Sequence, residues 1–269
     1  MFVTTSYGDD DVVPAGIRDR YEWIETGSAA AILKALAPHE WADLLSVLDG
    51  FALAPNRWLV AGGNKGDIAA DLDARFRRLG WLETRIDVAV QGYLFTDFAK
   101  KGTDRVARSR AEGESLYLEG YRVDNHKGRM IVDIEWNAKD GNLDRDMAAY
   151  RSWYEFGLID GAVIITKDRK PLLDLAREVW TRHQATVPVA ERSAKLPVDL
   201  TSTTTTSFDK ATERIRRGGA GTCPLLVIGV GREAWDGSDF TLAPETDPAG
   251  DTPLAGFDDE LATGDGSAG

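Results

Sequence analysis

Two short apolar runs constrain the fold of this chain more than any other feature. They are DGAVIITK at residues 160–167 and CPLLVIGV at residues 223–230. A continuous apolar run of this length is typical of a strand that is buried on both faces of a sheet. A sheet with two such strands needs helices over its faces, so we expect an α/β protein.

The remaining segments supply helices and strands in an order that fits this architecture. Apolar residues at helical spacing predict helices at residues 29–37, 38–48, 67–79, 142–159, 170–183 and 208–218. Further strands are predicted at residues 82–95 and, with a turn near NHKG, in two pieces of residues 116–137. We therefore expect one α/β domain at residues 1–235, with N-terminal helices at 28–80 and a central mixed β-sheet flanked by α-helices at 82–230.

The negative charge of the chain is concentrated at its C-terminal end. The formal net charge is −12, from 44 Asp and Glu against 32 Lys and Arg. Ten of the acids lie from Glu233 onward, where Lys and Arg are absent, so the rest of the chain has 34 acids against 32 bases. Gly, Pro and Thr are also common at 236–269, which predicts a disordered acidic tail. The net charge argues against a protein that simply coats nucleic acid, although the body carries local basic clusters.

Other bulk features favour a cytoplasmic protein. No apolar run is long enough to span a bilayer, and the first residues, MFVTTSYGDDDVVP, lack the basic start and apolar core of a signal peptide. The single cysteine, Cys223, cannot form an internal disulfide and fits a reducing compartment. One thiol and three histidines at unrelated spacings also argue against a structural zinc site.

The stretch MIVDIEWN at residues 130–137 places polar side chains at every second position of a predicted strand. Because strand side chains alternate between faces, Asp133, Glu135 and Asn137 point one way, and the apolar residues between them point into the core. A hairpin turn near NHKG would bring Asp124 beside Asp133 and Glu135. Three close carboxylates repel one another, and a divalent cation such as Mg²⁺, which takes oxygen ligands, relieves that repulsion. The alternative interpretation is a solvated face of an edge hairpin, with Lys139 pairing with the acids.

These residues resemble a known family. The stretch VDIEWNAKDGNLDRDMAAYRSWYEFGLIDGAVIITK, with Asp124 upstream and TTTTSFDKATERIRRGGAGTCPLLVIGV downstream, resembles the BglII/BstYI-like type II restriction endonucleases of the PD-(D/E)xK nuclease superfamily. The resemblance covers residues 55–232 and is strongest over 118–167. It implies a PD-(D/E)xK restriction-endonuclease-like fold, a homodimer around double-stranded DNA, and hydrolysis that requires Mg²⁺, with Mn²⁺ as a substitute.

The resemblance also implies roles for the acids. Asp124 falls where the family has its first metal-binding Asp, and Asp133 takes the place of its second acid. Glu135 occupies the position that is Lys in the usual superfamily motif, so the identity of the general base stays open. Our preferred hypothesis is a metal-activated water with Glu135 as proton acceptor. Glu83, expected at the end of the long N-terminal helix, is a fourth candidate, because superfamily members often place an acid or amide from that helix near the metal. The alternative is a solvated helix-end residue.

Contacts with DNA require basic and polar side chains, because phosphates dominate the affinity. Asn137 and Lys139 follow the acids directly and are candidates for orienting a phosphate, with a hydrogen bond that closes the loop as the alternative. Other candidates lie at residues 97–115, expected to be a surface loop or short helix, and near the last helix. They are Arg105, Arg108, Arg110, Thr204, Thr205, Lys210, Arg214 and Arg217, with Lys100, Lys101 and Arg216 nearby. The alternative for such a cluster is a solvated face.

The sequence therefore predicts a type II-like restriction endonuclease that hydrolyses phosphodiester bonds of double-stranded DNA at specific sequences. The alternative is a non-catalytic DNA-binding or interaction module with the same fold, against which the intact set of three carboxylates counts. A glycosidase is disfavoured, because two acids at positions i and i+2 of one strand lie too close and too parallel to flank a glycosidic bond.

Overall fold

The computed structural model describes residues 3–59, 67–95, 110–118, 120, 122–201 and 204–241. Within them, one seven-stranded sheet has the order β1-β2-β9-β8-β7-β6-β3. Its strands are β1 (Val3–Thr4), β2 (Tyr21–Thr26), β9 (Leu225–Val230), β8 (Gly161–Lys167), β7 (Met130–Glu135), β6 (Arg122–Lys127) and β3 (Leu82–Arg85). β8 runs parallel to β7 and β9, whereas the other neighbouring pairs are antiparallel. The predicted α/β class with a mixed sheet is confirmed.

The two apolar runs form the centre of this sheet. Every residue of β8 and β9 is buried, which explains why both strands are apolar at successive positions. β2, which lies beside β9, was not predicted, because Glu22 and Glu25 interrupt its apolar pattern. Glu25 is nevertheless fully buried, since Ser6 Oγ and the backbone N–H of Ala30 donate hydrogen bonds to its carboxylate.

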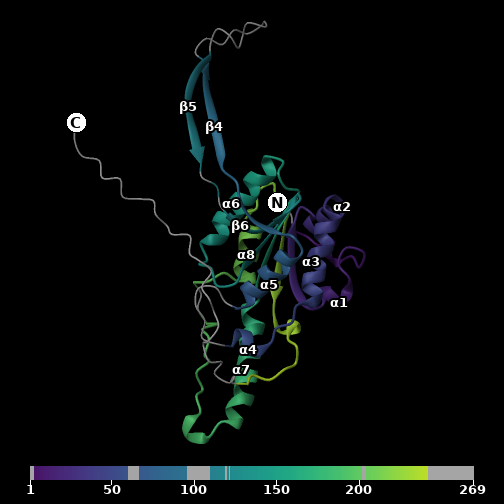
Figure 1. Ribbon diagram of the computed structural model, residues 1–269, viewed down its shortest axis with the longest axis vertical. Coiled ribbons are helices and arrows are strands. Elements are labelled where there is room, and N and C mark those ends of the chain that lie inside the picture. The colour runs from purple at the N-terminus through teal and green to yellow at the C-terminus, as the bar shows by residue number, and fades with distance from the viewer. Residues whose placement is uncertain are drawn as a thin grey trace, which may run out of the picture.

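Helices cover both faces of the sheet (Figure 1). The first core holds α1 (Ala15–Arg18), α2 (Ala29–Leu36), α3 (Pro38–Gly50), α4 (Pro55–Trp58), α5 (Asp67–Arg78) and α7 (Arg169–Thr186). The second core holds α6 (Asn142–Glu155) and α8 (Phe208–Arg216). β7 contributes to both, since Val132 and Ile134 pack in the first core and Ile131 packs in the second. Short 3₁₀ turns lie at Ser6–Gly8, Val189–Glu191 and Arg232–Ala234.

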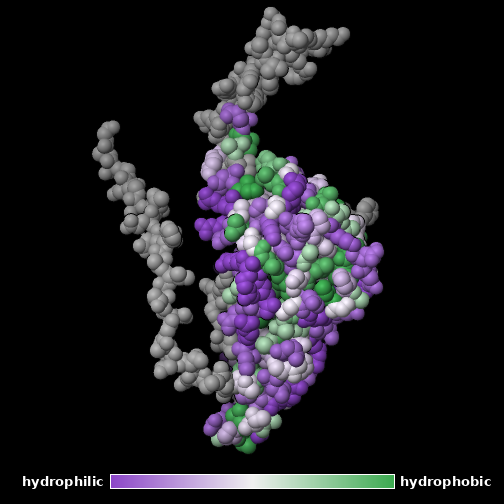
Figure 2. Space-filling model, turned by 45° about the vertical axis from the view of Figure 1, so that its right-hand side comes forward, coloured by the Kyte–Doolittle hydropathy of each residue, from purple (hydrophilic) through white to green (hydrophobic). Residues whose placement is uncertain are grey.

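Burial of the apolar residues in these two cores leaves a largely polar exterior. Hydrophilic residues cover most of the face that Figure 2 shows, with smaller hydrophobic areas between them. Among the helices of the described residues, none has the length and apolar composition of a membrane span.

The predicted strand at residues 82–95 proves to be two strands of different sheets. β3 pairs with β6 at the edge of the main sheet, whereas β4 (Val88–Phe95) pairs with β5 (Arg110–Leu118) in a ribbon that extends from the domain (Figure 1). The prediction of a loop or short helix at 97–115 is wrong for residues 110–115, which lie in β5. Residues 96–109 lie outside the described part of the chain. Alternating patterns predict strands locally, but the pairing partner depends on tertiary structure.

Packing contacts extend past the predicted domain boundary at residue 235. Phe240 is buried against the rings of Trp180 and His183 on α7. The backbone N–H of Thr241 donates a hydrogen bond of 2.8 Å to Asn56 Oδ1, and Asn56 Nδ2 donates one of 2.7 Å to Thr241 Oγ1. The remainder of the predicted acidic tail, residues 242–269, lies outside the described residues.

Candidate active site

The hairpin of β6 and β7 brings Asp124 beside Asp133. The register pairs Asn125 with Val132, so the two aspartates lie opposite each other one position further along. The backbone N–H of Asp124 donates a hydrogen bond of 2.6 Å to Asp133 Oδ1, and that of Ile134 donates one of 3.2 Å to Asp124 Oδ2. The hairpin predicted from the sequence is therefore present, although its turn lies at residues 128–129, with NHK still part of β6.

The acids lie inside the protein and not on a solvated edge. β7 is an inner strand between β6 and β8. Asp133 is 4% exposed and Glu135 is 8% exposed. Ile134 and Trp136 pack in the opposite core, as the alternation predicts. The interpretation of Asp133 and Glu135 as a solvated edge is therefore wrong.

Helix α6 covers the acids and adds two polar side chains that the sequence analysis missed. Asp146 and Tyr150 are one turn apart, so they share a face of the helix. The Tyr150 hydroxyl donates a short hydrogen bond to Asp133 Oδ2. Asp146 is 5% exposed, and its carboxyl lies within hydrogen-bond reach of that of Glu135. The available signal was this four-residue spacing on a helix that directly follows an acidic strand.

Burial and mutual repulsion raise the pKa values of these carboxyls. Burial first, and then the charge of Asp124, raise the pKa of Asp133 well above its usual range. Burial, and next the charges of Asp146 and Asp133, raise the pKa of Glu135 to about 9. Burial also raises the pKa of Asp146, and its carboxyl can share a proton with Glu135. The protein alone therefore lacks the positive charge needed to hold all these groups ionised at neutral pH.

The donor chemistry of the cluster fits a divalent cation. Within the described residues, no three His, Cys, Asp or Glu side chains converge as a preformed metal cage. Yet Glu135 Oε2 and Asp146 Oδ2 are buried and have no hydrogen-bond partner there. Carboxylate oxygens are the ligands that Mg²⁺ prefers, often one or two of them together with substrate phosphate and water.

Hydrogen bonds from the neighbouring segments fix the carboxyl end of β7. Thr166 Oγ1 donates to the Glu135 carbonyl at 2.7 Å, and Thr206 Oγ1 donates to the same oxygen at 2.9 Å. The buried amine of Lys167 donates to the Trp136 carbonyl at 2.7 Å and to Asn137 Oδ1 at 3.3 Å. Asn137 thus makes the loop-closing hydrogen bond weighed as its alternative role. Burial lowers the pKa of Lys167 to about 8.

The loop after β7 pairs with the segment before α8. Lys139 and Thr205 form an antiparallel bridge, and the backbone N–H of Asp140 donates to the Thr204 carbonyl at 2.9 Å. The backbone N–H of Thr206 donates to the Ala138 carbonyl at 2.9 Å. Two segments predicted separately as DNA contacts, Lys139 and the threonines, therefore lie side by side.

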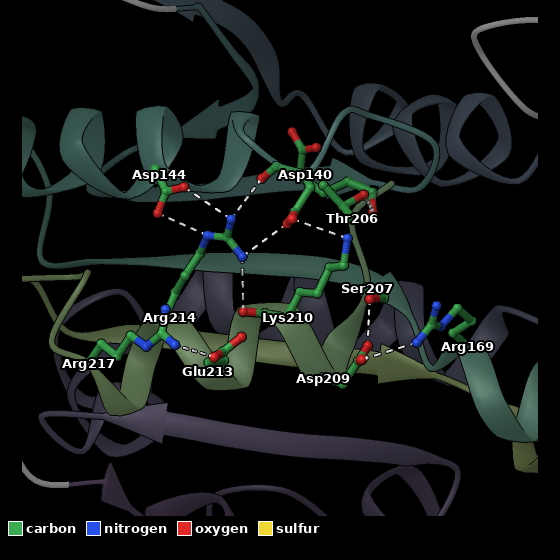
Figure 3. Close-up of polar contacts among 11 residues, drawn as sticks. Asp140, Asp144, Arg169, Thr206, Ser207, Asp209, Lys210, Glu213, Arg214 and Arg217 are labelled. Carbon is green, nitrogen blue, oxygen red and sulfur yellow. Dashed lines mark hydrogen bonds and ion pairs between the residues drawn. The ribbon is translucent and has the colours of Figure 1, made fainter. Parts of the chain in front are cut away.

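Two further DNA candidates form ion pairs inside the protein (Figure 3). Lys210 Nζ lies 3.1 Å from Asp140 Oδ2, and Arg214 Nη1 lies 3.0 Å from Asp140 Oδ1. Arg214 Nε also pairs with Asp144 Oδ1 at 2.9 Å. These pairs tie α8 to the loop after β7 and to the first turn of α6. The exposed Arg217, which directly follows α8, pairs with Glu213 of that helix.

The remaining predicted site residues lie elsewhere or outside the described chain. The prediction that Glu83 ends a helix is wrong, because it lies on β3, where its half-exposed side chain pairs with Arg122 at 3.6 Å. Arg105 and Arg108 lie outside the described residues, as do Lys100 and Lys101. Arg110 begins β5, and its side chain is not described.

The fold and the cluster together define a restriction-endonuclease-like protein: a mixed sheet between helices, with buried acids at the carboxyl end of an inner strand. The family model "Restriction endonuclease BglII/BglIII" matches residues 21–230, from the first residue of β2 to the last of β9. This chain belongs to the BglII/BglIII restriction endonuclease family. Membership implies a nuclease that cleaves DNA at specific sequences. No curated protein matches the chain.

Proposed function

We propose that this protein is a Mg²⁺-dependent type II restriction endonuclease that cleaves double-stranded DNA as a homodimer. The observation that carries the proposal is the buried carboxylate cluster at the carboxyl end of β7, in a chain of a restriction endonuclease family. A catalytic site is the simplest reason for a protein to keep repelling acids buried together, because burial of unpaired like charges costs stability.

Asp124 and Asp133 are the residues that would hold the cation. When bound, a divalent cation can activate water and stabilise the leaving oxygen of a phosphodiester. The hydrogen bonds from Tyr150 and from the Asp124 backbone N–H orient the Asp133 carboxyl. The Ile134 backbone N–H does the same for Asp124.

Glu135 is the proposed proton acceptor. It occupies the position that is Lys in the superfamily's usual motif, and a metal-activated water could pass its proton to this carboxylate. A general base works best when its pKa lies near the working pH. Burial raises the pKa of Glu135 above the ordinary carboxyl range, and a bound cation would favour the ionised carboxylate, which is the form that accepts a proton. The threonine hydrogen bonds to its carbonyl hold the strand end in place.

The DNA-contacting surface is proposed to begin at the loop after β7. Asn137, Lys139, Thr204 and Thr205 lie next to the acids or pair with that loop, which supports a role in placing the phosphate. Arg217 is exposed directly after α8, and it can contact DNA when its ion pair with Glu213 opens. The sequence alone supports three further DNA-binding candidates: Arg105, Arg108 and Arg110. Lys210 and Arg214 could contact DNA only after their ion pairs open. A homodimer would place one such cluster at each DNA strand.

Plasmid digestion tests the proposal. Methylated and unmethylated plasmids are incubated with the purified protein, with and without Mg²⁺, beside Asp133→Asn. A matched control is Asp209→Asn, which removes an exposed carboxylate on α8. Discrete fragments that require Mg²⁺, persist in the control and disappear in Asp133→Asn are the expected result. Intact DNA in every reaction, with binding still visible by gel shift, would favour the non-catalytic module instead.

A further inference from the structure

We propose that Asp146 of α6 is a further ligand of the divalent cation that Asp124 and Asp133 would hold. Glu135 faces the same cation through Oε2, and its second carboxylate oxygen stays available to accept the proton. The inference rests on the proposed function, because it extends the same site. It assigns to α6 a part of the metal site, in addition to its role as a cover for the sheet.

The position of Asp146 on α6 directs it at the acidic strand. Tyr150 lies one turn further along the same face and contacts Asp133. Asp133 and Glu135 are two residues apart on one face of β7, so the helix spacing matches the strand spacing. Asp146 therefore faces Glu135, and Tyr150 faces Asp133.

Two carboxylate oxygens in this contact point to a missing partner. Glu135 Oε2 and Asp146 Oδ2 are both buried and lack a hydrogen-bond partner among the described residues. The two side chains belong to residues that are more than nine-tenths buried. Buried polar atoms of folded proteins are nearly always satisfied, so two such oxygens on facing acids require an explanation. A proton shared by the two carboxyls can satisfy them in the empty site, and a cation that displaces this proton would satisfy both when bound.

Arg145, which pairs with Asp146, does not already fill this role. Arg145 Nε and Nη2 both lie 3.1 Å from Asp146 Oδ1, and neither bond reaches Oδ2. The Arg145 side chain is substantially exposed, so solvent screens its charge. One arginine therefore offsets part of the charge of Asp146 and leaves the face toward Glu135 available.

Cation binding to the full chain without DNA tests the inference. Chelator-treated protein is titrated with Mn²⁺, and free Mn²⁺ is measured by electron paramagnetic resonance. The variant is Asp146→Asn, which keeps the shape and removes the charge. The matched control is Asp144→Asn, which removes an exposed carboxylate two residues away on the same helix. Asp146→Glu tests whether a carboxylate restores binding.

The expected result is Mn²⁺ binding by the wild type that weakens on the order of tenfold or more in Asp146→Asn. Binding should be unchanged in Asp144→Asn and partly restored in Asp146→Glu. Thermal unfolding gives a second readout. Without cation, the melting temperature of Asp146→Asn should lie above that of the wild type. Added Mn²⁺ should raise the melting temperature of the variant less than that of the wild type. A purely structural Asp146 would give the opposite order of melting temperatures without cation.

Two outcomes would overturn the inference: unchanged Mn²⁺ affinity in Asp146→Asn, or no binding by the wild type at millimolar Mn²⁺. Cleavage assays on the same samples separate the two proposals. If the wild type cleaves DNA and Asp146→Asn keeps its Mn²⁺ affinity, the proposed nuclease function stands and Asp146 is not a metal ligand. If the DNA stays intact but Mn²⁺ binding depends on Asp146, the proposed nuclease function is wrong and the inference about Asp146 stands.

Discussion

The Tyr150 hydroxyl donates a hydrogen bond to Asp133 across the contact between α6 and β7. Asp133 receives a second hydrogen bond from the backbone N–H of Asp124 on the other side. The carboxylate is therefore oriented by a helix and by a hairpin that are built from different parts of the chain. Its position depends on how α6 packs against the sheet that contains this hairpin.

Removal of the Tyr150 hydroxyl should reduce both stability and cleavage. Tyr150→Phe leaves a buried Asp133 oxygen without its donor, at a cost of roughly 1–3 kcal/mol in the free energy of unfolding. Cleavage should fall as well, because Asp133 loses part of its orientation. Urea denaturation and plasmid digestion measure the two effects, with Tyr154→Phe on the same helix as control. Unchanged stability in Tyr150→Phe would contradict the prediction.

Lys167 should make the protein more stable as pH rises above about 8. Burial lowers the pKa of Lys167 from 10.5 to about 8. Between these values the unfolded chain keeps a proton that the folded chain has released, so the free energy of unfolding rises with pH. The expected gain is on the order of 3 kcal/mol across this window.

The test compares wild type with Lys167→Met by urea denaturation at several pH values. The variant lacks the titrating group, so the wild type should gain stability relative to it as pH rises. Taking the difference between the two proteins cancels the contributions of other titrating groups. A stability difference that stays constant over the window would show that Lys167 does not titrate there.

Asp140 should stabilise the protein more than Asp144. Asp140 is 34% exposed at its side chain and pairs with both Lys210 and Arg214, whereas Asp144 is 65% exposed and pairs with Arg214 alone (Figure 3). Asp140→Asn leaves two mostly buried cations less compensated, at a cost of roughly 1–2 kcal/mol, and Asp144→Asn should cost under about 1 kcal/mol. Urea denaturation measures both, and equal losses would argue against the role of the Asp140 pairs.

Gly128 should be required for the turn that aligns Asp124 with Asp133. Its φ of +54° lies in the left-handed region, and Lys127 pairs with Met130 across the turn. Gly128→Ala should lower the free energy of unfolding by roughly 1–2 kcal/mol, because a Cβ strains this conformation. Gly128→Asn should cost less, since Asn tolerates it better. Equal stability of the alanine variant and the wild type would exclude this strain.

Local patterns predicted much of the fold and part of the site. The apolar runs identified β8 and β9 as buried strands, because a strand that is buried on both faces is apolar at successive positions. The alternation in MIVDIEWN placed Asp133 and Glu135 on one face, and the short hairpin placed Asp124 beside them. Each of these inferences needs only neighbours within a few residues.

Contacts between distant segments had no comparable local pattern. β2 was not predicted because Glu25 makes its sequence look polar. The groups that allow Glu25 to be buried, Ser6 and Ala30, lie outside the strand. The continuous alternation at 82–95 concealed the division into β3 and β4. Glu83 was predicted at a helix end but lies on the edge strand β3, because the pairing of β3 with β6 has no local sequence pattern.

The sequence by itself determined the class of fold, the family and the row of acids on β7, because periodicity and motif spacing are properties of the chain. Only the tertiary structure decided that α6 covers those acids and brings Asp146 to Glu135 and Tyr150 to Asp133. It also decided that Lys210 and Arg214 contact Asp140. The physical reason is that side-chain partners are selected by packing across the sheet, and packing depends on elements far apart in the sequence.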